Sequence, residues 1–161
     1  MLFVVQIDTD AVEDPRVVAH IARGFLRGVV AQNRILLRQA RERGKPYPAL
    51  YESGVVFKRE PKPKRGRPRV QQLVDLRAVL RRRGGDCKHL CAWRVAELQE
   101  GEDPRADFKI YWRCGCIACG RMALRERTCR HCGGQVKPFI YHAEVRRSDG
   151  TAEDPSRYLG M

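Results

Sequence analysis

Two closely spaced cysteine pairs constrain this chain more than any other feature of its sequence. Cys116 and Cys119 form one Cys-x2-Cys pair, and Cys129 and Cys132 form a second pair after nine intervening residues. Four thiolates presented from two tight turns suit the tetrahedral coordination that Zn²⁺ prefers. The segment has few large apolar side chains with which to build a core of its own. The sequence therefore predicts a structural zinc site.

The cysteine count supports metal binding over a disulfide framework. The chain has seven cysteines, an odd number, and five of them crowd between Cys114 and Cys132. Such close pairs suit a metal, and they indicate a reducing compartment during folding. Cys114 is a spare thiol that is a possible substitute for Cys116 as a ligand. Disulfides or reduced free thiols are the alternatives.

Length and charge limit the remaining possibilities. With 161 residues we expect one main domain carrying an inserted segment. The formal net charge of +13 favours contact with nucleic acid, acidic proteins or anionic membranes. No apolar run approaches the roughly 18 residues that a membrane span needs, and no charged leader precedes an apolar segment. We therefore expect a soluble protein with no membrane partner and no cleaved leader.

Hydrophobic spacing and turn signals outline the secondary structure. Asp14-Pro15 is typical of a helix start, and Ile21, Phe25 and Val29 begin an apolar stripe that runs towards Gly44. The same criteria predict strands over residues 2–7, 55–57, 108–112 and 139–145 and helices over residues 15–44, 70–82 and 88–99.

A basic segment separates the first predicted helix from the second half of the chain. Residues 58–69 contain seven basic residues and three prolines. This composition cannot bury a core, so we expect an exposed arm or loop. It would contact phosphates, dock on an acidic partner or remain solvated.

The sequence Gly84-Gly85-Asp86-Cys87 precedes the helix predicted over residues 88–99. A cysteine at a helix start lies near unpaired amides, which predicts a lowered thiol pKa and a nucleophilic sulfur. The adjacent glycines would admit a substrate backbone, and the Cys87 amide would stabilise an oxyanion. The alternative is a small buried hydrophobe, the interpretation that Cys91 receives.

A predicted hairpin brings a histidine and a carboxylate together. If its loop is residues 148–150, Arg147 faces Thr151. Asp154 then lies on the same side of the sheet as His142, one diagonal step away. A two-residue loop would separate them. A carboxylate behind a histidine is what a cysteine nucleophile requires of its base. A surface histidine and a turn-ending Asp-Pro are the alternative.

Three motifs follow one another in the chain: Gly85-Asp86-Cys87, then Tyr141-His142-Ala143-Glu144-Val145, then Glu153-Asp154-Pro155-Ser156. In this order they resemble the transglutaminase-like proteins encoded by tailed bacteriophages. The resemblance covers residues 82–161 except 114–137, while the first half matches only in outline. Lys88 and His89 depart from it, because acidic residues are common there, and they would change the charge of the cleft.

The resemblance implies an α+β fold, in which a transglutaminase-like or papain-like core packs helices against a small antiparallel sheet. Residues 1–113 and 133–161 would form this core, and residues 114–132 an inserted zinc knuckle between its two long strands. Cys87 would be the nucleophile, His142 the general base and acid, and Asp154 the orienting carboxylate. The implied chemistry is acyl transfer or amide hydrolysis through a thioester.

Family members of this kind are associated with phage particles. The resemblance therefore implies other virion proteins as partners, a protein substrate, and a location in the host cytoplasm during assembly and then in the virion. A non-catalytic neck or tail component that retains the fold is an alternative, as is a zinc-ribbon protein that binds nucleic acid through its basic surface. A zinc deaminase is disfavoured, because both cysteine pairs precede His142-Ala143-Glu144.

Overall fold

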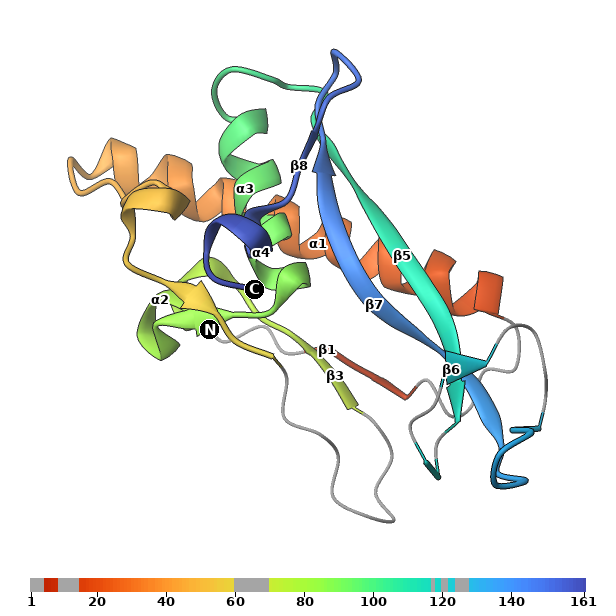
Figure 1. The fold of residues 1–161 in the computed structure, drawn as a ribbon. Helices are drawn as coiled ribbons and strands as arrows, with labels where there is room; N and C mark the ends of the chain where they lie inside the picture. Colours follow the sequence, from red (N-terminus) through yellow and green to blue (C-terminus); the bar gives the residue numbers. More distant parts are fainter. Residues whose placement is uncertain (1–4, 9–14, 60–69, 117, 120–121, 124–127) are drawn as a thin grey trace.

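The computed structural model describes residues 5–8, 15–59, 70–116, 118–119, 122–123 and 128–161. The described residues have helices packed against a small, mainly antiparallel sheet, which confirms the predicted α+β class (Figure 1). In chain order the elements are β1 (Val5–Asp8), α1 (Pro15–Glu42), the 3-10 helix η2 (Leu50–Glu52), β2 (Val56–Phe57), β3 (Val70–Leu73), α2 (Leu76–Arg82), β4 (Gly84–Gly85), α3 (Cys87–Gln99), β5 (Asp107–Cys116), β6 (Met122–Ala123), β7 (Val136–Arg146), β8 (Ala152–Glu153) and α4 (Pro155–Tyr158).

The long helix α1 packs one face against α3 and the main sheet. Leu26 and Val29 are buried on this face, and the buried Asn33 accepts the Leu76 amide at 2.9 Å, which joins α1 to the start of α2. Phe25, predicted on the buried stripe, is 37% exposed. The prediction was wrong at this position because the neighbouring Leu26 is buried in its place, whereas Val29 of the same stripe is buried as predicted.

Helix α3 is the centre of the core. Of its 13 residues 10 are buried, with Leu90, Cys91 and Trp93 fully enclosed. Asp86 caps its first turn by accepting the amides of Lys88 and His89, an arrangement that fixes where the helix begins. The predicted helix start at Cys87 and the structural role of Cys91 are confirmed.

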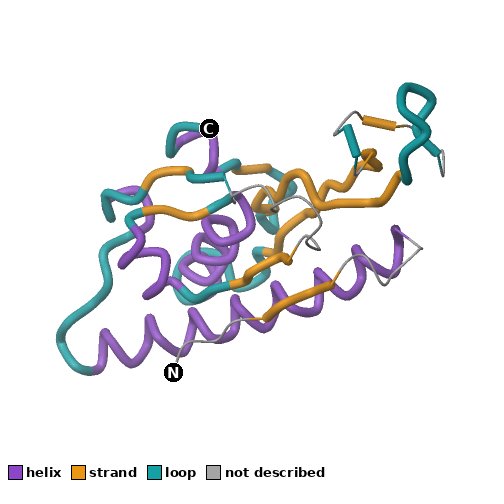
Figure 2. Tube along the Cα trace, turned by 90° about the horizontal axis from the view of Figure 1, so that it is seen from below, coloured by secondary structure: helices purple, strands orange, loops and turns teal. Residues whose placement is uncertain are grey.

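The main sheet has the strand order β6-β5-β7-β8. Strands β5 and β7 form a long antiparallel hairpin whose far end carries the cysteine-rich segment, as predicted. Figure 2 shows this end projecting away from the helices. At the other end, Phe108, Ala143 and Val145 are buried in the common core with α3. The hairpin thus has one end packed in the core beside α3 and carries the cysteine-rich segment at its other end.

Residues 70–82 do not form one helix. Val70–Leu73 is strand β3, which pairs antiparallel with β1, and the helix begins only at Leu76. Asp75 caps it by accepting the Ala78 amide at 3.1 Å. The prediction followed apolar spacing and overlooked this aspartate, a strong helix-start signal.

A third, parallel pairing of β2 with β4 leads the chain to Cys87. It confirms a strand near residues 55–57. The carboxyl end of the chain lies against β2, because the Phe57 amide donates to the Leu159 carbonyl at 2.7 Å. Strand β1 agrees with the strand predicted over residues 2–7 where that range is described. Most of the predicted arm, residues 60–69, lies outside the described residues.

Candidate functional site

Cys87 lies where the start of α3 meets strand β7. It is the first residue of the helix, 7% exposed, and its sulfur is hydrogen-bonded by the backbone of Ala143. Ala143 is the immediate neighbour of His142, which places the thiol beside the part of β7 that carries the histidine. The sequence-predicted nucleophile and base therefore come from two elements in direct contact.

The predicted low pKa of Cys87 is wrong. Burial, followed by the charge of Asp86, raises the pKa of this thiol to about 11. Lys88 and the backbone amides of Ala143 and Lys88 lower it, but they do not overcome these two effects. The amides at a helix start lower the pKa of a cysteine, but at Cys87 burial and the capping carboxylate outweigh them.

A buried charge cluster surrounds the start of α3. Lys88 is 4% exposed and its Nζ lies 2.6 Å from Asp86 Oδ2, while His89 Nδ1 lies 3.3 Å from the Asp86 amide and completes the cap. Burial opposes the ionised form of Asp86, yet Lys88 and His89 together hold its pKa well below the usual range. Lys88 was predicted to change the charge of a cleft, whereas it pairs inside the protein. The sequence signal was its position two residues after a capping aspartate.

His142 and Asp154 are in contact. His142 Nε2 lies 2.9 Å from Asp154 Oδ2, and their side chains are 15% and 16% exposed. The pairing of Val145 with Glu153 sets the predicted register, and the Arg147 amide donates to the Thr151 carbonyl. The prediction of a three-residue loop with both groups on one side is confirmed.

Further contacts orient both members of this pair. Asp154 Oδ1 accepts the Ser156 amide at 3.0 Å and so caps α4. The ring of Tyr111, on the neighbouring strand β5, stacks on the imidazole with 6.1 Å between centroids and 28° between planes. Tyr111 is itself held through its hydroxyl, which donates to Glu144 Oε1 at 2.5 Å. The imidazole is thus fixed in position at its edge and on its face.

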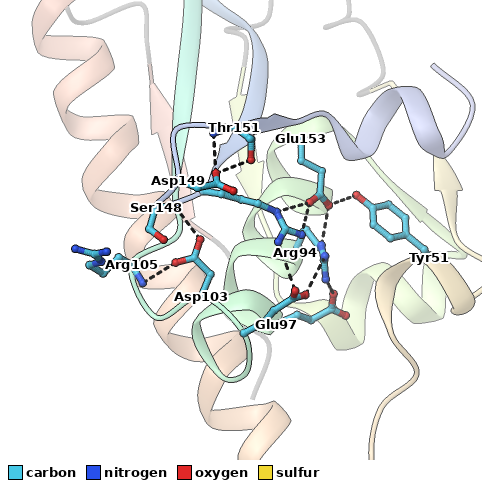
Figure 3. A network of polar contacts seen from close by, with 11 residues as sticks. Tyr51, Arg94, Glu97, Asp103, Arg105, Ser148, Asp149, Thr151 and Glu153 are labelled. Carbon is cyan, nitrogen blue, oxygen red and sulfur yellow. Dashed lines mark hydrogen bonds and ion pairs between the residues drawn. The ribbon is translucent and has the colours of Figure 1, made fainter.

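The residue before Asp154 is held by a polar network that the sequence analysis missed (Figure 3). Arg94 Nε donates to Glu153 Oε1 at 2.7 Å, and Arg147 donates to Glu153 Oε2 at 3.0 and 3.2 Å. The Tyr51 hydroxyl also donates to Glu153. These contacts join β8 to α3 and η2. They thereby fix the backbone from which Asp154 reaches His142.

The four predicted metal ligands converge at the hairpin tip. The Sγ atoms of Cys116 and Cys132 are 3.4 Å apart, those of Cys119 and Cys129 are 3.7 Å apart, and all four lie within 4.8 Å of one another. Sulfurs around a tetrahedral zinc are separated by roughly 3.8 Å, given Zn–S bonds of about 2.3 Å. The cluster has the spacing to hold one metal ion.

The electrostatics of the cluster favour a bound cation. Backbone hydrogen bonding, with Cys119 first, lowers the pKa of Cys116 to about 6. The Gly134 amide favours ionisation of Cys132, but Cys116 and Cys119 raise the pKa of Cys132 to about 12. Cys116 therefore ionises readily, whereas the neighbouring cysteines oppose ionisation of Cys132. A cation bound between the sulfurs would stabilise both thiolates.

The second turn of the tip requires glycine. Gly133 has φ +69°, and its amide donates to the Cys129 carbonyl at 2.8 Å. A Cβ on Gly134 would lie 2.9 Å from the Cys116 sulfur and 2.8 Å from Ala118 Cβ. The glycines thus allow the two cysteine turns to close on each other. The side chain of Cys114, the possible substitute ligand, lies outside the described part of the chain.

Comparison of the chain with protein-family models, with curated proteins and with solved structures returned no match. None of the described helices combines the length and the apolar character that crossing a membrane requires.

Proposed function

We propose that the chain is a transglutaminase-like enzyme that uses Cys87, His142 and Asp154 for acyl transfer or amide hydrolysis. The observation that carries the proposal is the 2.9 Å contact between His142 Nε2 and Asp154 Oδ2, one residue from the Ala143 backbone that contacts the Cys87 sulfur. A carboxylate that holds one ring nitrogen leaves the other ring nitrogen to exchange a proton with a thiol.

In the proposed reaction, His142 takes the Cys87 proton as the sulfur attacks an amide carbonyl. The C–S bond forms, and the tetrahedral intermediate places its negative oxygen near the Cys87 amide, because the Lys88 and His89 amides already donate to Asp86. The C–N bond then breaks as His142 returns the proton to the departing amine or ammonia. An incoming amine or water attacks the thioester and gives a proton to His142, the C–S bond breaks, and the Cys87 sulfur takes the proton back from His142.

The raised pKa of Cys87 determines the resting state of this pair. With a pKa of about 11, the thiol is protonated at neutral pH. Proton transfer to His142 therefore has to accompany substrate binding, because the buried sulfur is not a standing thiolate. The partly exposed His142 and Asp154 side chains provide the side from which a substrate would approach.

We further propose that the four-cysteine cluster holds a structural Zn²⁺. Four thiolates complete the zinc coordination, which leaves no position for a reacting water. The ion would fix the tip of the β5–β7 hairpin, at the opposite end from the buried residues beside α3, and take no part in the acyl chemistry.

Hydroxylamine as the acyl acceptor and a benzyloxycarbonyl-glutaminyl-glycine donor test the enzymatic proposal. The wild type and Cys91→Ala should form the hydroxamate, and Cys87→Ala should form none. Cys91 is the matched control, because it is a second buried thiol on the same helix. Equal product formation by Cys87→Ala would contradict the assigned nucleophile.

A non-catalytic structural component, for example of a phage neck or tail, is the second candidate. The burial of Cys87 in the main core cluster favours it, because a packed sulfur needs no chemistry to explain its position. This candidate predicts that particles carrying Cys87→Ala assemble and infect normally. Loss of infection with a folded variant would instead support the enzyme.

A further inference from the structure

A contiguous basic cluster lies at the carboxyl end of α2, next to β2. Arg81, Arg82 and Arg83 are exposed there, as are Lys58 and Arg59 at the end of β2. Lys58 joins the two segments, because its Nζ donates to the Arg82 carbonyl at 2.8 Å and its methylene groups lie over Gly84. Figure 1 shows β2 and α2 next to each other. We call these five residues the α2-end cluster.

The α2-end cluster gathers basic residues that have no acidic partner among the described residues, whereas several other arginines of the protein have one. Elsewhere Arg34 and Arg38 share Glu100, while Arg94 and Arg147 share Glu153. No described carboxylate lies within 4.0 Å of a charged nitrogen of the cluster. The described part of the chain therefore leaves the positive charge of the cluster without a paired carboxylate.

The carboxylates nearest in the chain do not neutralise this surface. Asp75 is 2% exposed and pairs with Arg77 at 2.7 Å, and Asp86 is 5% exposed and pairs with Lys88. Both carboxylates are buried and already form an ion pair with a basic residue outside the cluster. Some of the cluster's charge offsets the negative end of the α2 dipole, but that requires only a fraction of one positive charge.

We propose that the α2-end cluster binds the phosphate backbone of duplex DNA. Five exposed cations side by side complement a duplex, which carries a negative charge about every 1.7 Å along its axis. The cluster contains no aromatic ring on which the bases of a single strand would stack. Its donors are guanidinium and ammonium groups, which contact phosphates and do not read a sequence. This binding function is independent of the acyl chemistry and of the zinc cluster.

A pair of charge-matched variants tests the proposal. The first is Arg59→Gln, Arg81→Gln, Arg82→Gln, which leaves in place the Lys58 contact and Arg83, whose φ is +49°. The control is Arg23→Gln, Arg43→Gln, Lys45→Gln, three exposed cations of α1 and the loop after it. Each variant removes three positive charges from the net +13. Circular dichroism and zinc content check that both are folded.

Fluorescence anisotropy with a labelled DNA duplex, repeated at several salt concentrations, gives the slope of log K against log salt. The cluster variant should reduce the magnitude of this slope by about 2 to 3, because each lost phosphate contact removes about 0.9. The control should reduce it by less than about 1. Equal losses in both variants would show a net-charge effect and overturn the proposal, as would an unchanged slope in the cluster variant.

Two further probes test the choice of partner. A labelled single strand of the same length, and a labelled polyglutamate of the same charge, should each bind the wild type more weakly than the duplex. Tighter binding of polyglutamate would assign the surface to an acidic protein, and tighter binding of the single strand would contradict the duplex geometry. Hydroxamate formation, measured in the same samples, keeps this result separate from the enzymatic proposal.

Discussion

The two ends of the β5–β7 hairpin are ordered by different forces. At one end Ala143 and Val145 are fully buried in the core that contains α3, so exclusion of apolar surface from water holds the strand. At the other end Cys119 and Cys132 are exposed, and four sulfurs converge in a small turn region. The candidate catalytic residues thus lie on a framework made rigid by packing, whereas we propose that the tip depends on a bound metal ion.

Loss of the metal should produce the largest difference in behaviour between the two ends of the hairpin. Cys129→Ser removes a buried sulfur from the cluster, and zinc bound by four thiolates contributes apparent free energies of about 10–16 kcal/mol. Zinc content should fall from about one ion per chain to near zero. Amide hydrogen exchange should become fast in residues 128–136 and remain slow in α3.

Cys87→Ser is the matched control for that experiment, because it removes a thiol that is not in the cluster. It should keep its zinc and its protected tip. A wild-type protein that is purified under reducing conditions without metal, yet retains slow exchange at the tip, would show that the two ends are ordered in the same way.

The end of the hairpin beside α3 should be destabilised when the polar network around Glu153 is disrupted. This effect should be smaller than the effect of removing a metal ligand from the tip. Glu153→Gln replaces a carboxylate that pairs with Arg94 and Arg147, and loss of charged hydrogen bonds of this kind costs about 2 kcal/mol. The free energy of unfolding, measured in urea, should fall by that amount. Hydroxamate formation should fall as well, because β8 positions Asp154.

Glu102→Gln is the control for this variant. Glu102 contacts the same two arginines at 3.5 and 3.4 Å, but its side chain is 62% exposed. Pairs so exposed contribute about 0–0.5 kcal/mol. If Glu102→Gln were as destabilising as Glu153→Gln, burial would not be the source of the network's stability.

Elements with strong local signals were predictable from the sequence. Helix α1 follows from Asp14-Pro15 and from apolar spacing, and the glycines before Cys87 together with the apolar stripe after it mark where α3 begins. The hairpin register followed from its turn residues, which correctly brought Asp154 to His142. The cysteine spacing identified the four sulfurs that converge. In each case neighbouring residues determine the geometry.

Features that depend on distant residues were not predictable. Residues 70–73 became strand β3 because β1, far away in sequence, pairs with them. The raised pKa of Cys87 arises first from its burial in the core and then from the charge of Asp86. Lys88 was expected to face a cleft, but it is buried in the core and paired with Asp86. In these cases the structure of a segment depends on strand pairing or on burial by other parts of the chain, and local sequence patterns do not show either.

The proposed pairing of Cys87 with His142 is tested most directly by the pH dependence of iodoacetamide alkylation at Cys87, followed by peptide mass spectrometry in zinc-loaded protein. A thiol with a pKa of about 11 reacts slowly at neutral pH unless a base takes its proton. In the proposed mechanism His142 is that base, so alkylation of the wild type should already be fast well below pH 11. At pH 7 it should be at least about tenfold faster than in His142→Asn. Identical profiles that rise only near pH 11 in both proteins would contradict the pairing.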